Sequence, residues 1–209
     1  MDKEINNNGY DYVDLKLPSG TLWATRNVGA LKPEEAGFYF QWGDIVGYKA
    51  NQIGIDDEQK KFSWKTYKFD LTGDGLFFKK YNLKGITLDL EDDAAHIHMG
   101  GDWHIPNEKQ IQELIDNTTS AWISQNGEYG CLFISKKDKS KYIFIPAAGY
   151  AVFDTIYFRG EYGYVWGNEP MEENNLAGKS LYFSSERTNF YENQRFCGVP
   201  VRGVIGKLD

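Results

Sequence analysis

Three histidines stand close together in the sequence and are the first residues to consider for metal chemistry. They are His96, His98 and His104. A zinc site needs three or four ligands that converge on one point, drawn from His, Cys and carboxylate side chains. His96 and His98 could share one face of a strand, but no cysteine or close carboxylate completes a set. We therefore predict no metal site at these histidines.

The segment from 70 to 75 resembles the start of a calcium loop. Its sequence, DLTGDG, places oxygen ligands at alternate positions, as calcium loops do. Such a loop also needs a bidentate glutamate further on, but the residues that follow are Leu76, Phe77, Phe78 and Lys79. We predict a plain turn here, without a bound ion.

Other side chains with catalytic chemistry are scattered along the chain. The two cysteines, Cys131 and Cys197, lie far apart, and a chain this poor in cysteine favours two buried thiols over a disulfide. The paired acids at 92–93 and 172–173 are neighbours on the chain, so their side chains diverge. No Ser-His-Asp arrangement suggests itself. We predict no catalytic residues and no cofactor.

Residue types common at binding surfaces are concentrated in the segment from 150 to 195. It is rich in Tyr, Phe, Asn, Ser and Arg, which supply contact area and adaptable hydrogen bonds at binding surfaces. The candidate partner-binding residues are Tyr157, Arg159, Tyr191, Asn193 and Arg195. For these residues, packing in the core is an equal alternative. A core position is the favoured interpretation for Tyr164, Trp166, Tyr182 and Phe196.

Most of the elements that must position these residues are strands. Alternating apolar residues at 10–17, a Pro-Ser-Gly turn and a further run at 21–28 predict an opening hairpin. Residues 32–36 predict the first turn of a short helix, with an early proline and acids at its positive end. Residues 45–92 have little periodicity and predict a long irregular excursion, too aromatic to be disordered. Its anchoring aromatic residues are Phe62, Trp64, Tyr67, Phe77, Phe78 and Tyr81.

One helix has clear signals at its start. Asn107 can cap it, and Gln110 is placed to complete a capping box. Apolar residues within 111–115 form a buried stripe, and the helix ends near Asn117. We expect Trp103, just before it, to be buried against this helix. Further strands are predicted at 121–124, 131–135, 142–145, 162–166, 180–184 and 196–205.

Composition limits the classes of partner. The formal net charge of −7 argues against a nucleic-acid binder, which needs a basic face. No apolar run approaches the ~20 residues of a membrane-spanning helix, and the polar N-terminus lacks a signal-peptide pattern. We expect a tail over residues 1–9, disordered or bound to a partner, and a single domain over residues 10–209. Such a chain is kept inside a cell, or is exported without a signal, as in assembly of a virus particle.

Several motifs together carry a family resemblance. They are DLKLPSGTLWATRNVGA from residue 14, WGD from 42, SWKTYK from 63, LEDDAAH from 90, GGDWHIP from 100, PAAGY from 146 and a terminal Val-Arg at 201–202. From about Tyr12 to Val204, the chain resembles the Fibrobacter succinogenes major paralogous domain family of gut Bacteroidetes and their phages. The resemblance implies a C-type-lectin-like α+β fold with small antiparallel sheets, one or two short helices and extensive ordered loops. Formylglycine-generating enzymes and the variable receptor-binding proteins of diversity-generating retroelements share this branch of the fold.

The chain departs from these relatives at informative positions. His104 stands where the family usually has arginine, and Gly203 where it usually has proline. Calcium-dependent lectins of this fold use a Glu-Pro-Asn or Gln-Pro-Asp motif with a Trp-Asn-Asp motif; residues 166–170 hold similar residue types in another order. The enzymatic branch needs two neighbouring cysteines near its C-terminus to hold copper, and only Cys197 lies there. The resemblance therefore gives no support to a calcium or copper site.

The expected function is a non-enzymatic binding or structural module. We expect a phage virion component, such as a fibre or decoration subunit assembled in the host cytoplasm, that forms a homo-oligomer or joins a larger assembly. Its partners would be other virion or surface proteins, or a host glycan, and would not include nucleic acid. One alternative is a secreted or surface-attached Bacteroidetes binding domain. Another is a degenerate relative of the formylglycine-generating oxidases.

Overall fold

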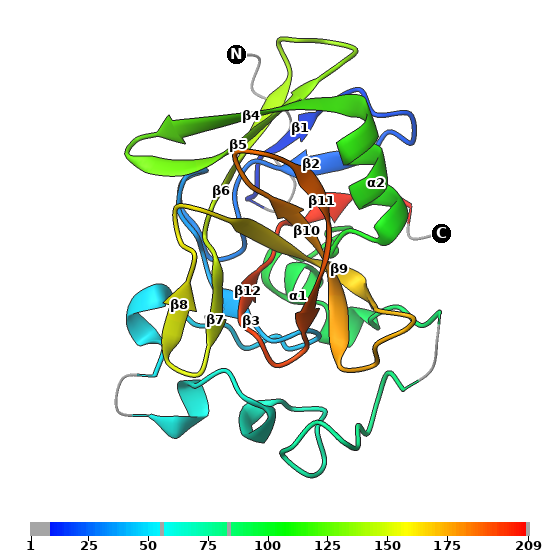
Figure 1. Cartoon of the computed structure of the whole chain (residues 1–209). Helices are drawn as coiled ribbons and strands as arrows, with labels where there is room; N and C mark the ends of the chain where they lie inside the picture. Colours follow the sequence, from blue (N-terminus) through cyan, green and yellow to red (C-terminus); the bar gives the residue numbers. More distant parts are fainter. Residues whose placement is uncertain (1–8, 55–56, 83–84, 208–209) are drawn as a thin grey trace.

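Small antiparallel sheets make up most of the regular structure, and only short helices accompany them (Figure 1). The computed structural model describes residues 9–54, 57–82 and 85–207. This arrangement agrees with the α+β class predicted from the sequence. Of the expected N-terminal tail, residues 1–8 lie outside the described residues.

The strands group into the following sheets. The first sheet contains β1 (Tyr12–Asp14), β2 (Leu22–Ala24) and β13 (Val204–Ile205), and the second contains β11 (Thr188–Gln194), β10 (Ala177–Phe183) and β9 (Gly163–Pro170). The third pairs β12 (Val199–Pro200) with β3 (Tyr39–Phe40), and the fourth contains β4 (Thr118–Gln125), β5 (Glu128–Ser135) and β6 (Tyr142–Pro146). The fifth pairs β7 (Tyr150–Val152) with β8 (Thr155–Tyr157). The α-helices are α1 (Ala94–Met99) and α2 (Glu108–Asn117).

The two ends of the described chain meet in one sheet. β1 and β2 form the predicted opening hairpin, with Val13 opposite Trp23. β13 pairs with the other edge of β2, where Val204 lies opposite the same tryptophan. Trp23 is fully buried, so the sequence that opens the domain and the sequence that closes it share one part of the core.

Several strands differ from the sequence-based expectation. The strand predicted over 196–205 is two short strands, because Val199 pairs with β3 while Val204 pairs with β2. The sequence did not predict β7, β8 or β11. β11 has the polar sequence TNFYENQ and pairs only with β10 among the described strands, so it needs no continuous apolar face.

The start of helix α2 is confirmed. The Asn107 side chain accepts a hydrogen bond from the backbone nitrogen of Gln110, and the Gln110 side chain accepts one from the backbone nitrogen of Asn107. Two backbone donors that the first helical turn would leave unpaired are thereby satisfied. Ile111 and Leu114 are fully buried, as the predicted stripe requires.

Trp103 is buried as expected, but not against the predicted neighbour. Its side chain belongs to the core cluster that contains Met99, whereas Ile111 of α2 belongs to a second cluster. Gly100 and Gly101 have φ angles of 71° and 56°, so the chain reverses directly after α1. The turn returns Trp103 to the side of α1.

Gly203 makes room for this packing. A Cβ atom at Gly203 would lie 2.5 Å from Met99 Sδ and 3.1 Å from Trp103 Cε3. Those separations are too short for a carbon side chain without movement of the neighbours. A glycine at this position therefore fits the close approach of the last strand region to α1 and its turn.

The helix predicted at 32–36 is wrong. These residues form turns, and their acids serve side-chain contacts instead. Glu34 accepts hydrogen bonds from Asn126 and Gln125 of the β4–β5 hairpin, and Glu35 accepts one from the backbone of Leu31. Acids can stabilise a helix start through the dipole, but here Glu34 bonds to a distant hairpin and Glu35 closes a local turn.

The excursion over 45–92 is irregular, as predicted. Its regular parts are the short 3-10 helices η1 (Ala50–Gln52), η2 (Glu58–Lys60), η3 (Trp64–Thr66) and η4 (Leu90–Asp92). Its buried aromatic anchors are Phe62, Tyr67, Phe78 and Tyr81. Trp64 is partly buried, whereas Phe77 is 63% exposed and is not an anchor.

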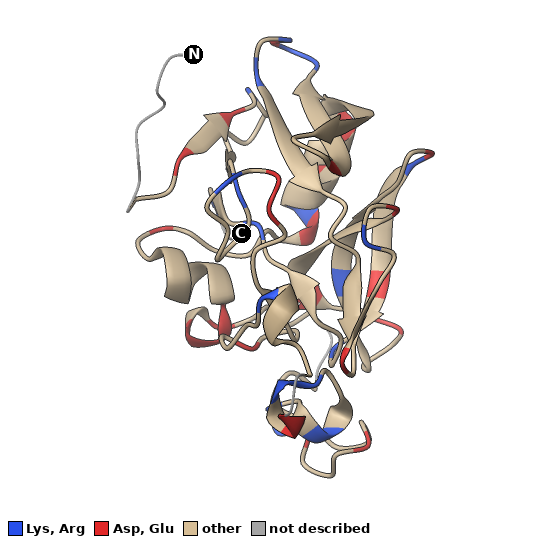
Figure 2. Ribbon diagram, turned by 90° about the vertical axis from the view of Figure 1, so that its left-hand side faces the viewer, with Lys and Arg blue, Asp and Glu red and all other residues tan. Residues whose placement is uncertain are grey.

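Charged residues of both signs occur throughout the fold (Figure 2). This agrees with the interleaved acids and lysines of the sequence. Within the described residues, every helix is too short or too polar to cross a membrane.

Candidate binding surface

Strand register brings tyrosines together from two sheets. In β7 and β8, Tyr150 lies directly opposite Tyr157. In the β9–β10 pair, Tyr164 lies opposite Tyr182, and Tyr191 of β11 lies opposite Ser180, two residues from Tyr182. Side chains opposite each other, or two residues apart on one face, are within reach of aromatic rings. The register therefore creates two tyrosine clusters, one on each sheet.

Ring contacts join the two clusters into one surface. Tyr150 and Tyr164 connect the sheets, with ring centroids 5.4 Å apart and planes at 89°. Phe158 and Tyr162 connect them a second time, through contacts to Tyr150 and Tyr182. We call this network the tyrosine surface, and its members are Tyr150, Tyr157, Phe158, Tyr162, Tyr164, Tyr182 and Tyr191.

The tyrosine surface has a buried floor and an exposed rim. Tyr164 and Tyr182 are only 3% and 8% exposed, as their predicted core role requires. Tyr157, Phe158 and Tyr191 are 43%, 42% and 46% exposed. Rings held by several neighbours lose little conformational freedom when a partner binds. Neighbouring rings therefore hold the exposed rings in place.

The backbone at the rim is strained. Phe158 has a φ angle of 57°, in the left-handed region that glycine and asparagine adopt more readily. Such a conformation costs about 1–3 kcal/mol and persists where the surrounding structure holds it. Here the carbonyl of Phe158 accepts hydrogen bonds from the backbone of Glu161 and Tyr162. These hydrogen bonds hold the Phe158 ring at its exposed position.

The tyrosine hydroxyls are unengaged by the protein. The tyrosine hydroxyls of this surface form no hydrogen bond with the described residues. Burial, followed by the neighbouring hydroxyls of Tyr191, Tyr182 and Tyr150, raises the pKa of Tyr164. Burial likewise raises the pKa of Tyr150. The raised pKa keeps the hydroxyls of Tyr150 and Tyr164 neutral, and the hydroxyls of this surface can donate and accept hydrogen bonds with a partner.

The structure brings together only some of the predicted binding residues. Tyr157 and Tyr191 both lie on the tyrosine surface and are exposed. Arg159 is exposed, but its Nη2 donates to Glu128 Oε1 at 3.0 Å. Both residues of this ion pair line an open groove of about 670 Å³, together with the backbone turn at 29–37. Arg159 thus lies in a groove of mixed charge, outside the ring network.

Asn193 and Arg195 are buried and do not contribute to an exposed surface. Asn193 is 4% exposed and accepts a hydrogen bond from the hydroxyl of Ser180. Arg195 is fully buried between Trp42 and Phe78, with its Cζ 4.7 and 5.1 Å from the two ring centroids. Every second residue from Tyr191 onward becomes more buried: Tyr191 is exposed, Asn193 is almost fully buried and Arg195, just after β11, is in the core. Strand alternation in the sequence cannot show where that change occurs.

The sequence prediction also missed members of the surface. Phe158 and Tyr162 were counted only in the aromatic composition of the segment, not as binding residues. Tyr150 closes the Pro-Ala-Ala-Gly-Tyr motif, which pointed to the fold rather than to a partner. The alternating aromatic residues at 162, 164 and 166 indicate a strand. Which of these side chains are exposed depends on how that strand pairs with β10, and the alternation does not show this.

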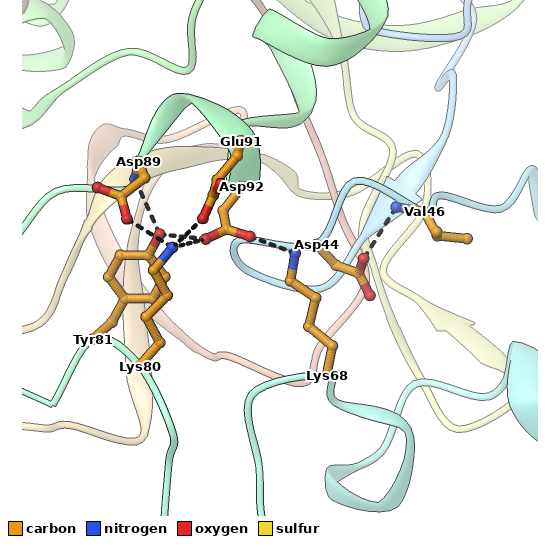
Figure 3. A network of polar contacts seen from close by, with 8 residues as sticks. All are labelled: Asp44, Val46, Lys68, Lys80, Tyr81, Asp89, Glu91 and Asp92. Carbon is orange, nitrogen blue, oxygen red and sulfur yellow. Dashed lines mark hydrogen bonds and ion pairs between the residues drawn. The ribbon is translucent and has the colours of Figure 1, made fainter.

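A polar cluster joins η4 to the earlier excursion residues Lys68 and Lys80 (Figure 3). The carboxylates of Asp89, Glu91 and Asp92 come within 4.8 Å of one another, the one such group of potential metal ligands in the described residues. Lys80 Nζ contacts all three at 2.6–2.9 Å, and Lys68 also binds Asp92. Burial raises the pKa of Asp92, but the two lysines outweigh it and hold that pKa below its usual range. The lysine ammonium groups therefore neutralise these carboxylates and hold the middle of the excursion against its end.

The three histidines do not converge. His96 Nδ1 donates to the carbonyl of Trp103 at 3.3 Å, and His104 Nδ1 donates to that of Asp102 at 3.1 Å. His98 Nε2 donates to the carbonyl of Ile45 at 2.8 Å. One nitrogen of each ring is therefore bonded to a backbone carbonyl, of the turn after α1 for His96 and His104 and of Ile45 for His98.

The two calcium-like segments are structural. In the 70–75 loop, Asp70 accepts hydrogen bonds from the backbone of Thr72 and Gly75, which makes the predicted turn. The 166–170 segment lies within β9, where Trp166 is buried and Glu169 accepts a hydrogen bond from the backbone of Glu108. The carboxylates of Asp70 and Glu169 thus serve a local turn and the start of α2.

The two cysteines do not fit a copper pair. Both thiols are free and buried, and they belong to different core clusters, Cys131 with Phe133 and Cys197 with Trp42. Burial raises the pKa of each thiol to about 12. A thiolate is the form that binds metal or attacks a substrate, so neither cysteine is prepared for that chemistry.

Comparisons of this chain with protein-family models, with curated proteins and with solved structures found no match.

Proposed function

We propose that the chain is a non-enzymatic binding module that holds a partner on the tyrosine surface. The observation that carries this proposal is the combination of rigid, partly exposed rings with unengaged hydroxyls. Aromatic side chains in such arrangements dominate the binding energy of known interfaces. The strained backbone at Phe158 supports the same proposal. The chain has an aromatic side chain at a backbone conformation that glycine would adopt with less conformational strain.

The proposed fold is C-type-lectin-like. Support comes from the small antiparallel sheets, the pairing of both chain ends in one sheet, the short helices and the long irregular excursion. The family resemblance from about Tyr12 to Val204 points to the same fold. An experimental structure with a different sheet order would refute this part of the proposal.

The proposed setting is a phage particle, with the surface of a Bacteroidetes cell as the alternative. The family resemblance supports both settings, because related domains occur in both. Mass spectrometry of purified phage particles and of outer cell-surface fractions distinguishes them. A homo-oligomer or larger assembly is part of the proposal, and light scattering after size-exclusion chromatography tests it.

A paired substitution tests the binding surface. Replacing both Tyr157 and Tyr191 with serine removes two exposed rings, whereas Tyr142→Ser removes a 39% exposed tyrosine outside the network. The labelled parent protein and both variants are incubated with purified phage particles and with Bacteroidetes cells, and binding is measured by flow cytometry or sedimentation. We expect the double variant to lose at least about 2 kcal/mol, roughly thirtyfold in Kd. Binding that survives the double substitution, or that falls equally with Tyr142→Ser, would place the site elsewhere.

A further inference from the structure

We propose that the partner held by the tyrosine surface is a chain of neutral sugars, bound without a metal ion. This inference rests on the proposed function and adds the chemical class of the ligand. The hydroxyls, the charge and the extent of the surface each support it.

The hydroxyls match a polyhydroxylated ligand. A sugar ring has apolar C–H groups on its faces and hydroxyls at its edge, so it can stack on an aromatic ring while it exchanges hydrogen bonds beside it. Tyrosine offers both contacts, since its hydroxyl donates and accepts. On this surface, the hydroxyls of Tyr157 and Tyr191 are exposed with their rings and have no hydrogen bond to the described protein.

The charge matches a neutral ligand. Burial and neighbouring hydroxyls raise the pKa of Tyr150 and Tyr164, so these two side chains bring no negative charge to the surface at physiological pH. Two arginines on the contributing segments are already engaged. Arg187 lies over the ring of Tyr182, with its Cζ 5.6 Å from the centroid, and Arg159 pairs with Glu128. An anionic chain would need a cluster of unpaired cations, which these segments do not present.

The extent of the surface matches a chain rather than a single sugar. Tyr157 and Tyr191 lie at opposite ends of the ring network, with Tyr150 and Tyr164 between them. A ligand that touches both exposed rings must extend across several ring widths. A protein partner would also favour exposed aliphatic side chains beside the rings. The strongly exposed leucines, Leu31, Leu71 and Leu76, are 64–78% exposed and lie on other segments.

The test uses neutral oligosaccharides as the probe. The parent protein is applied to an array of α- and β-linked glucans, mannans and galactans in the presence of EDTA, and the best ligand is then titrated by calorimetry. We expect binding in EDTA. Tyr191→Phe keeps the ring and loses the hydroxyl, so it should weaken binding roughly threefold to tenfold. Tyr191→Ala and Tyr157→Ala should each weaken binding more than Tyr191→Phe does, and Tyr142→Ala should match the parent.

The outcomes separate this inference from the proposed function. If no neutral oligosaccharide binds, yet binding to particles or cells still requires Tyr157 and Tyr191, the partner is a protein and the saccharide inference is wrong. If sugar binding disappears in EDTA, a metal holds the ligand and the inference is wrong. If sugar binding persists in all tyrosine variants, both the inference and the placement of the site fail. Urea unfolding of each variant confirms that the fold is intact, as expected for exposed positions.

Discussion

Replacing the buried arginine Arg195 should strongly destabilise the protein. Its Nη1 and Nη2 donate to the carbonyl of Tyr81 at 3.1 Å, and Nη2 also donates to Asn175 Oδ1 at 2.8 Å. The guanidinium lies over the rings of Trp42 and Phe78. Arg195 directly follows β11. It therefore links the end of that strand to Tyr81 of the excursion and to Trp42, which follows β3.

Two destabilising contributions and one stabilising contribution set the change in the free energy of unfolding. Arg195→Ala leaves the buried carbonyl of Tyr81 unpaired, at about 1–3 kcal/mol, and it leaves a cavity between two rings, which typically costs about 2–5 kcal/mol. Against this, burial lowers the pKa of Arg195, which shows that the buried charge itself is unfavourable. Removing the charge recovers that cost. We expect a net loss of about 3–5 kcal/mol for Arg195→Ala.

Arg195→Met separates the terms. Methionine retains most of the side-chain volume, so the cavity cost largely disappears while the buried carbonyl of Tyr81 stays unpaired. We expect a loss of about 2 kcal/mol for this variant. The assay is equilibrium unfolding in urea at neutral pH, with the slope of the transition compared among variants. If Arg195→Ala unfolds within about 1 kcal/mol of the parent, the assignment of this side chain to the core is wrong.

Other predictions concern single residues. Asn107→Ala should lower the free energy of unfolding by about 1 kcal/mol, because it removes the cap of α2; exposed Gln112→Ala in the same helix is the control, and equal effects would count against the cap. Trp103→Ala should cost roughly 3–5 kcal/mol by cavity formation, and a melting temperature within a degree or two of the parent would contradict this. Cys131 and Cys197 should resist alkylation in the native protein and react in urea, with reaction of the native protein as the contrary result. Their folded pKa, about 12, lies above the unfolded value, so their contribution to stability is fully present below about pH 9 and is lost as the pH rises to about 12. Unfolding measured at pH 8 and pH 11 should therefore show a greater loss of stability in the parent than in Cys131→Ala.

Local signals in the sequence predicted local structure well. The capping box of Asn107 and Gln110 forms because both partners lie within one helical turn, and no distant residue has to cooperate. The opening hairpin forms where apolar alternation and a Pro-Ser-Gly turn agree. The helix predicted at 32–36 does not form, and the Glu34 carboxylate instead accepts hydrogen bonds from side-chain amides of the β4–β5 hairpin, about 90 residues along the chain.

The sequence by itself determined the composition of the binding segment, and only the tertiary structure decided which of its side chains face solvent. Tyr191, Asn193 and Arg195 lie on the same strand face by alternation, and their types suit a binding surface. Tyr191 is exposed, whereas Arg195 is enclosed by Trp42 and by the carbonyl of Tyr81, which is 114 residues away. Exposure depends on which segments cover a strand, and that covering is made by contacts between residues far apart in the sequence.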